Sequence, residues 1–128
     1  MEKQKYAAIV LAAGSGKRMN SKVHKQYLII QDRPVLYYSL KEFQDSAVDE
    51  IVLVVGKGEE EFCRREIVDK YGISKVKAIV EGGKERYHSV FEGLKQTSDA
   101  DYVLIHDGAR PFVNQDIIRR CMLEVPEY

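Results

Sequence analysis

Glycines and basic residues cluster directly after the first apolar run of the chain. The stretch VLAAGSGKRMN, residues 10–20, places Gly14 and Gly16 just before Lys17 and Arg18. Because glycine has no Cβ atom, backbone N–H groups can approach an anion closely there, and Arg and Lys supply positive charge to phosphate oxygens. The residue types predict a polyphosphate-binding loop. A solvated basic turn, with glycines placed only for its geometry, accounts for the spacing equally well.

This loop fits neither of two common nucleotide-binding motifs. A P-loop needs glycine where this chain has Leu11, and Ser or Thr where it has Arg18. A dinucleotide-binding fingerprint needs a third glycine where the chain has Met19. Lys22 and Lys25 follow within a short span and add charge suited to several phosphates. Any phosphate site here is therefore of another kind.

A second glycine segment, EGGKERYHSV, begins at Glu81. Its paired glycines, ending at Gly83, permit close approach of a flat ligand. Ser89 lies near a predicted helix start, where it serves either as a ligand contact or as a plain helix cap. Arg86 pairs with Glu85 or with a phosphate. His88 has no ligand-spaced partner, and we interpret it as a surface residue.

A third polar segment, HDGARPF, follows a buried run and contains Asp107. A carboxylate at a strand end is a usual magnesium position when phosphates complete the coordination, although a cap or turn aspartate is the alternative. His106 is expected on the opposite face, as a hydrogen-bonded core residue. Arg110, held extended by Pro111, faces either the site or a carboxylate. No spacing of Ser, His, Asp or Cys indicates a covalent nucleophile.

The elements that must position these segments alternate between strands and helices. Buried strands are predicted at residues 7–12, 50–56, 75–83 and 102–108. The intervening patterns are helical, and the sequence β-α-β-α-β-α-β favours a parallel sheet with right-handed crossovers. The first predicted helix begins at Pro34 and carries Leu36, Leu40 and Phe43 on one face, and a charged helix is predicted over 59–71. A third helix is marked by Val90, Phe91 and Leu94. A last helix is predicted after an Asn114 N-cap and carries Ile117, Ile118 and Cys121.

Composition excludes several other classes of protein. The chain has 128 residues, which suits one domain, and its 45% hydrophobic content suits a packed core. Lys plus Arg and Asp plus Glu balance at 20 each, so the broad positive field of a nucleic-acid binder is missing. No segment reaches membrane-spanning length. Cys63 and Cys121 form no disulfide framework, which leads us to expect a cytoplasmic protein.

The three polar segments meet at one place in such a fold, since ligands of open α/β sheets bind beyond the carboxyl ends of the strands. LAAGSGKRM followed by KQYL, GGKERYHSV and HDGARPF, in this order and at these separations, resembles the N-terminal half of the 2-C-methyl-D-erythritol 4-phosphate cytidylyltransferase family. The resemblance covers essentially the whole chain. It implies a Rossmann-like three-layer nucleotidyltransferase fold of the α/β class with a mainly parallel sheet.

The resemblance also implies a reaction, in which CMP passes from CTP to methylerythritol phosphate with Mg²⁺ as cofactor and pyrophosphate as the second product. Arg18 and Lys25 would stabilise the transition state, and Asp107 and Arg110 would lie on the substrate side, Asp107 near the metal. The residues predicted to bind the nucleotide are Ala12, Ala13, Gly14, Ser15, Gly16, Gly83, Lys84 and Ser89.

Two departures from the family pattern affect these expectations. His24 stands where many members have proline before the lysine, which bears on how Lys25 is aimed. Family chains also continue well past the last residues, LEVPEY. We therefore expect residues 1–128 to be the nucleotide-binding N-terminal part of one cytidylyltransferase domain, inactive alone, with acceptor contacts and a homodimer arm in a C-terminal half. A ribitol-5-phosphate cytidylyltransferase, and a CTP-binding module without turnover, remain as alternatives.

Overall fold

Four parallel strands form the main sheet of the computed structural model, which describes residues 5–12, 29–30, 33–107 and 118. The strands are β1 (Tyr6–Ala12), β4 (Glu50–Val55), β5 (Val76–Glu81) and β6 (Tyr102–Asp107), and they lie in the order β5-β4-β1-β6. Each pairs with its neighbour in parallel. The four predicted strands and their parallel arrangement are confirmed.

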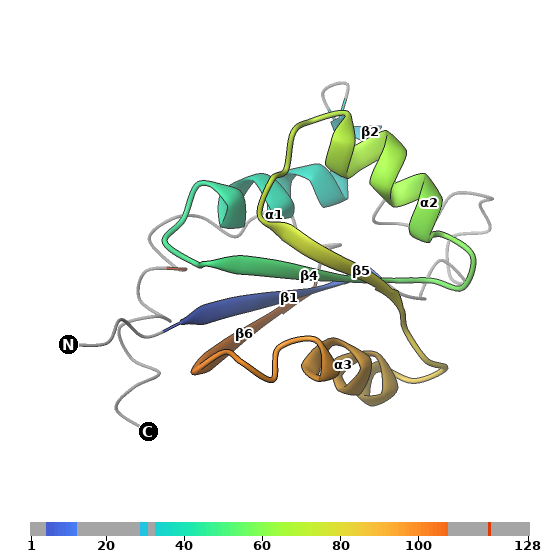
Figure 1. Ribbon diagram of the computed structural model, residues 1–128. Helices are drawn as coiled ribbons and strands as arrows, with labels where there is room; N and C mark the ends of the chain where they lie inside the picture. The colour runs from blue at the N-terminus through green and yellow to red at the C-terminus, as the bar shows by residue number, and fades with distance from the viewer. Residues whose placement is uncertain (1–4, 13–28, 31–32, 108–117, 119–128) are drawn as a thin grey trace.

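Helices cover both faces of the sheet and make three layers (Figure 1). One face carries α1 (Val35–Gln44) and α2 (Glu60–Cys63), which continues into the π-helix η3 (Arg64–Asp69). The other face carries α3 (Arg86–Lys95), which contacts β4, β1 and β5. A two-stranded antiparallel sheet of β2 (Ile29–Ile30) and β3 (Arg33–Pro34) precedes α1. This is the Rossmann-like three-layer α/β arrangement that was predicted.

Alternate residues of the central strands face opposite layers, as the pleat of a strand requires. Val10 of β1 belongs to the cluster under α1 and η3, together with Leu36, Leu40 and Phe43 of α1. Its neighbour Ile9 belongs to the cluster on the α3 side. Because both faces are covered, β1 is apolar along its length, and so is β4 after its first residue, Glu50.

Helix details differ from the expectations at three places. Pro34 ends β3, opposite Ile29, and α1 begins one residue later. The helix predicted over 59–71 is described as α2 with the π-helix η3. Phe91 and Leu94 lie in a helix as expected but are 58% and 42% exposed, because α3 turns Ser89 and Gly93 toward the sheet. Of the predicted last helix, the structure describes only Ile118, which is helical and buried.

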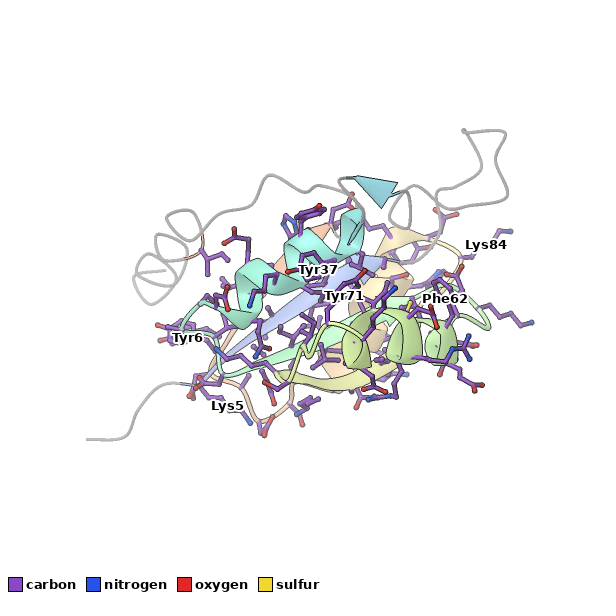
Figure 2. The ribbon with its side chains drawn as sticks, turned by 90° about the horizontal axis from the view of Figure 1, so that it is seen from above. Lys5, Tyr6, Tyr37, Phe62, Tyr71 and Lys84 are labelled. Atoms are coloured by element: carbon purple, nitrogen blue, oxygen red, sulfur yellow. The ribbon has the colours of Figure 1, made fainter. Side chains whose placement is uncertain are left out.

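Ion pairs connect the strands at the amino ends of the sheet. At the amino ends, Lys5 pairs with Asp99 and Glu50, and Lys77 pairs with Glu50 at 3.1 Å. These contacts tie the starts of three strands together. Lys84 lies at the opposite end of the molecule from Lys5 (Figure 2). Within the described residues, no helix is long and apolar enough to cross a membrane.

Candidate functional site

The carboxyl ends of β1, β4, β5 and β6 form one edge on which described candidate residues meet. Ala12, the last residue of β1, is paired with Val55, and its neighbour Leu11 is paired with Asp107 of β6. The Gly82 N–H donates to the Val55 carbonyl at 2.8 Å, so the glycine segment after β5 is fixed to the same edge. With strands about 4.8 Å apart, the ends of β5 and β6 are separated by roughly 14 Å. The edge is long enough for an extended ligand.

The loop between β5 and α3 brings backbone and charge to this edge. Gly83 and Lys84 are exposed and lie between the strand end and the first helical residue, Arg86. The first turn of α3 contains no acidic side chain. The N-cap residue Glu85 accepts the N–H of His88 with its own side chain, so part of the helix start is already capped. The helix dipole still favours an anion there, and the Lys84 ammonium adds positive charge nearby. The loop is suited to bind a phosphate group or the edge of a base.

Ser89 is not the helix cap that sequence reasoning offered as its alternative role. The N-cap of α3 is Glu85, and Ser89 lies in the first turn, where its N–H donates to the Glu85 carbonyl at 3.2 Å. Ser89 is only 4% exposed and faces the sheet. Arg86 is exposed at the first helical position. The capping role thus belongs to Glu85, which stands three residues before His88, the spacing of a capping box.

His88 is exposed, as predicted, and its side chain makes two contacts with the loop before α3. Its ring Nδ1 accepts a hydrogen bond from the backbone N–H of Glu85 at 3.3 Å. Its Cβ lies against Gly83 so closely that a Cβ atom on residue 83 would be 2.2 Å from it. Sequence reasoning missed both contacts. The Glu85-to-His88 spacing was the available signal, although capping boxes usually carry Glu or Gln at the second position.

Asp107 and His106 occupy opposite faces at the end of β6. Asp107 is half-buried and aligned with Leu11, whose side chain belongs to the α3-side cluster. His106 faces α1, where its Nε2 lies 3.3 Å from the Ser39 hydroxyl and its ring contacts Phe43. The prediction of a hydrogen-bonded core histidine is confirmed. Asp107 therefore stands at the carboxyl edge, one strand from Ala12.

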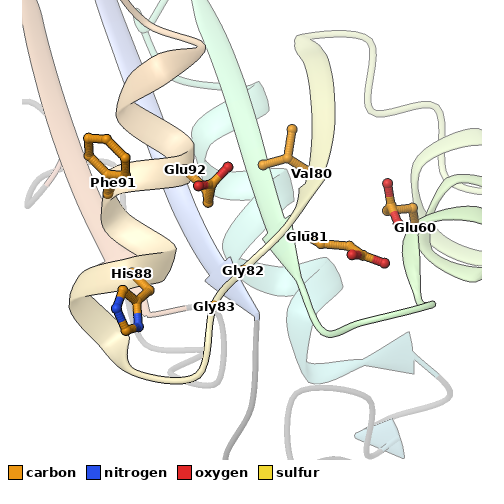
Figure 3. Close-up of a pocket in the computed structure, with 8 residues that line it drawn as sticks. All are labelled: Glu60, Val80, Glu81, Gly82, Gly83, His88, Phe91 and Glu92. Carbon is orange, nitrogen blue, oxygen red and sulfur yellow. The ribbon is translucent and has the colours of Figure 1, made fainter.

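A pocket of about 500 Å³ opens beside the glycine segment (Figure 3). Its polar lining is mostly acidic, and sequence reasoning did not find it. It is lined by Glu60, Val80, Glu81, Gly82, Gly83, His88, Phe91 and Glu92. Three carboxylates repel phosphate, so this pocket does not suit a triphosphate.

Glu60 and Glu81 face each other across one side of this pocket. Burial raises the pKa of Glu60, and a hydrogen bond and charge repulsion from Glu81 raise it further. Glu81 is held in place because its carboxylate accepts the Gly58 N–H at 2.9 Å. The pair brings the start of α2 to the end of β5, and it concentrates negative charge beside the glycine segment.

Seven of the predicted site residues lie outside the described residues, and their positions stay predictions from the sequence. They are Ala13, Gly14, Ser15, Gly16, Arg18, Lys25 and Arg110. The structure places the other five, Ala12, Gly83, Lys84, Ser89 and Asp107, at one edge of the sheet or in the first turn beside it.

Comparison with known proteins identifies the family. The model of the IspD family, described as 2-C-methyl-D-erythritol 4-phosphate cytidylyltransferase, matches residues 6–127. A relative of that name from Lachnoclostridium phytofermentans is 53% identical over 124 residues, covering 97% of this chain and 53% of the relative. A second, from Lachnospira eligens, is 55% identical over 115 residues, covering 89% of this chain and 50% of the relative.

A solved structure gives the same result. The 4-diphosphocytidyl-2C-methyl-D-erythritol synthase from Anaerococcus prevotii superimposes with a TM-score of 0.77 at 33% identity, covering 95% of this chain and 51% of that one. The chain thus spans about half the length of the curated relatives it matches. It belongs to the 2-C-methyl-D-erythritol 4-phosphate cytidylyltransferase family.

Proposed function

We propose that the protein containing these residues transfers CMP from CTP to 2-C-methyl-D-erythritol 4-phosphate. The observation that carries this proposal is the edge shared by Ala12, the Gly83 loop and Asp107, in a chain whose family is cytidylyltransferases. Parallel α/β sheets bind nucleotides at such an edge. The proposal concerns the whole protein, because this chain spans about half the length of its relatives.

The reaction needs no protein nucleophile. An oxygen of the acceptor's phosphate attacks the α-phosphorus of CTP in line, a new P–O bond forms, and the bond from that phosphorus to the bridging oxygen breaks. The bond's electron pair leaves with pyrophosphate. Negative charge grows on the equatorial oxygens and on the leaving group. Arg18 and Lys25 are the predicted cations that stabilise this charge, and Lys84 would add to the field from the second loop.

Magnesium fits this site only together with the nucleotide. Asp107 offers hard carboxylate oxygens at the end of β6, beside β1. Among the residues that the structure describes, no group of three or more His, Cys, Asp or Glu side chains could hold a metal ion. A Mg²⁺ ion held by one or two carboxylates is usually completed by phosphates and water. Asp107 would hold the ion, which when bound would neutralise charge on the phosphate oxygens.

The oligomeric state and the cellular compartment of the full-length protein are inferred from the family resemblance and the composition. We expect a homodimer whose contacts lie in the C-terminal half of the full-length protein. The reduced thiol of Cys63, which is buried in the core, suits the reducing cytoplasm. Residues 1–128 alone should bind CTP weakly and turn over no substrate, since the acceptor contacts are expected outside them.

A product analysis with competing substrates tests the proposal. The full-length natural protein that contains residues 1–128 is incubated with Mg²⁺, an equimolar mixture of CTP and ATP, and either methylerythritol phosphate or ribitol 5-phosphate. We expect the CDP derivative of methylerythritol as the main product, because a site shaped for a pyrimidine excludes a purine by size. Preferential use of ribitol 5-phosphate would favour the related cytidylyltransferase. CTP binding without any product would favour a binding module.

A further inference from the structure

His88 and Gly83 make the closest contact between α3 and the loop that precedes it. A Cβ atom added to Gly83 would be 2.2 Å from the His88 Cβ, 3.0 Å from its Cγ and 3.4 Å from its Nδ1. Carbon atoms in ordinary contact are about 3.5–4.0 Å apart. The backbone of residue 83 is therefore pressed against the His88 side chain. Figure 3 shows the Gly82–Gly83 segment passing beside the His88 ring.

The same histidine also fixes the far end of the loop. Its Nδ1 accepts the N–H of Glu85, the N-cap residue of α3, at 3.3 Å. The near end is fixed independently, because the Gly82 N–H donates to the Val55 carbonyl at the end of β4. Gly83 and Lys84 lie between these attachments, and Lys84 is the charged one. Its backbone position thus depends on the strand at one end and on His88 at the other.

The ring of His88 is itself supported by its surroundings. The Tyr87 ring lies 4.3 Å from it, measured between centroids, at an angle of 46°. His88 shares the acidic pocket with Glu60, Glu81 and Glu92, and Gly82 and Gly83 of the loop line the same pocket. The imidazole therefore contacts the loop from the acidic pocket.

We propose that His88 is a positioning residue that holds the loop of residues 82–85, and with it Lys84, in the shape that binds the nucleoside triphosphate. The inference rests on the proposed function. His88 itself touches no substrate in this account. It acts through packing on Gly83 and through the hydrogen bond to Glu85, so its loss should weaken nucleotide binding more than it slows the chemical step.

The test compares CTP binding by variants of the full-length natural protein, measured by calorimetry with Mg²⁺ present. His88→Ala keeps the Cβ atom beside Gly83 but removes the ring, and with it the acceptor for the Glu85 N–H and the ring's packing on Gly83. It should raise the Kd for CTP by about 3- to 30-fold, the range that corresponds to loss of one capping interaction. His88→Gln keeps an acceptor that can reach the N-cap N–H and should recover most of the affinity. Lys95→Gln, an exposed change at the other end of α3, is the matched control and should leave the Kd unchanged.

Steady-state kinetics separate positioning from simple helix stability. In His88→Ala the KM for CTP should rise while kcat at saturating CTP stays within about threefold of wild type. His88→Phe keeps a ring against Gly83 without the acceptor, so it gives the same test if the alanine variant does not fold. Its Kd should lie between those of wild type and His88→Ala, or above wild type if only the phenylalanine variant folds.

One result would overturn only the role of His88, and another would contradict the proposed function itself. A folded His88→Ala or His88→Phe protein with wild-type Kd and KM for CTP, and only a lower Tm, would show that His88 is a helix cap and would overturn the inference while leaving the proposed function intact. A wild-type protein that binds no CTP would contradict the proposed function and, with it, this inference.

Discussion

Gly83→Ala is the substitution whose effect on the proposed site can be worked most directly from the structure. The new Cβ would be 2.2 Å from the His88 Cβ, about 1.3 Å closer than ordinary carbon contact allows. The clash is with the base of the side chain, so a rotamer change at His88 cannot relieve it. The φ angle of Gly83 is not in the left-handed region, so alanine adds no backbone strain. The loop and the start of α3 must therefore separate by roughly 1 Å.

A displacement of that size should affect function far more than stability. Misplacing a substrate-positioning group by about 1 Å can cost about 100-fold, so we expect kcat/KM for CTP to fall by about two orders of magnitude. The free energy of unfolding should fall by only about 1–2 kcal/mol, because residue 83 is exposed and the loop can shift into solvent. Initial rates with varied CTP, alongside thermal unfolding of the same full-length protein, measure both quantities.

Gly93→Ala is the matched control on the same helix. Its Cβ would be 2.8 Å from Ile9 Cγ2 and 3.2 Å from Val54 Cγ2, in the core beneath α3 and away from the loop. This change should alter the Tm and leave kcat/KM within about threefold of wild type. If folded Gly83→Ala protein also keeps kcat/KM within about threefold of wild type, the glycine loop does not position the nucleotide and the reasoning is wrong.

Three further changes test other parts of the site. Arg18→Ala should lower kcat by roughly two to five orders of magnitude with little effect on folding, and near-normal turnover at saturating substrates would remove Arg18 from the mechanism. Asp107→Asn should raise the Mg²⁺ concentration needed for half-maximal rate, whereas an unchanged requirement would indicate a structural aspartate. Glu60→Gln should raise the Tm at pH 7. Because the folded protein raises the pKa of Glu60 above its ordinary value of 4.5, the charged carboxylate costs stability once the pH rises past that value, and glutamine carries no charge. This gain should vanish at pH 3.5, where the carboxyl group is protonated in both states, and an equal gain at both values would show that charge is not its cause.

The strands and their common edge could be predicted from sequence because their signal is local. Ile9, Val10 and Leu11 form a continuous apolar run, which is expected when a strand is covered on both faces. Once the order of strands and helices is known, parallel pairing brings Ala12 and Asp107 to the same edge. The family motifs then supplied the chemistry, which strand periodicity alone does not contain.

Other features depend on tertiary contacts that no local pattern reports. Phe91 and Leu94 indicated a helix, but Ser89 and Gly93 face the sheet because α3 packs closely over Ile9. His88 is exposed as predicted, but its contact with Gly83 exists only because the loop returns that glycine to its side chain. Glu60 of α2 and Glu81 of β5 repel each other although they are far apart along the chain. Such pairings follow from packing, so the sequence pattern could not reveal them.

The fate of the phosphorus atoms of CTP tests the central claim most directly. The full-length protein is incubated with Mg²⁺ and methylerythritol phosphate, using CTP labelled at either the α- or the γ-phosphate. The account predicts that the α-label appears in the acceptor product and the γ-label in pyrophosphate, in equal amounts and only when the acceptor is present. Transfer of the γ-label to the acceptor, or acceptor-independent release of inorganic phosphate, would contradict it.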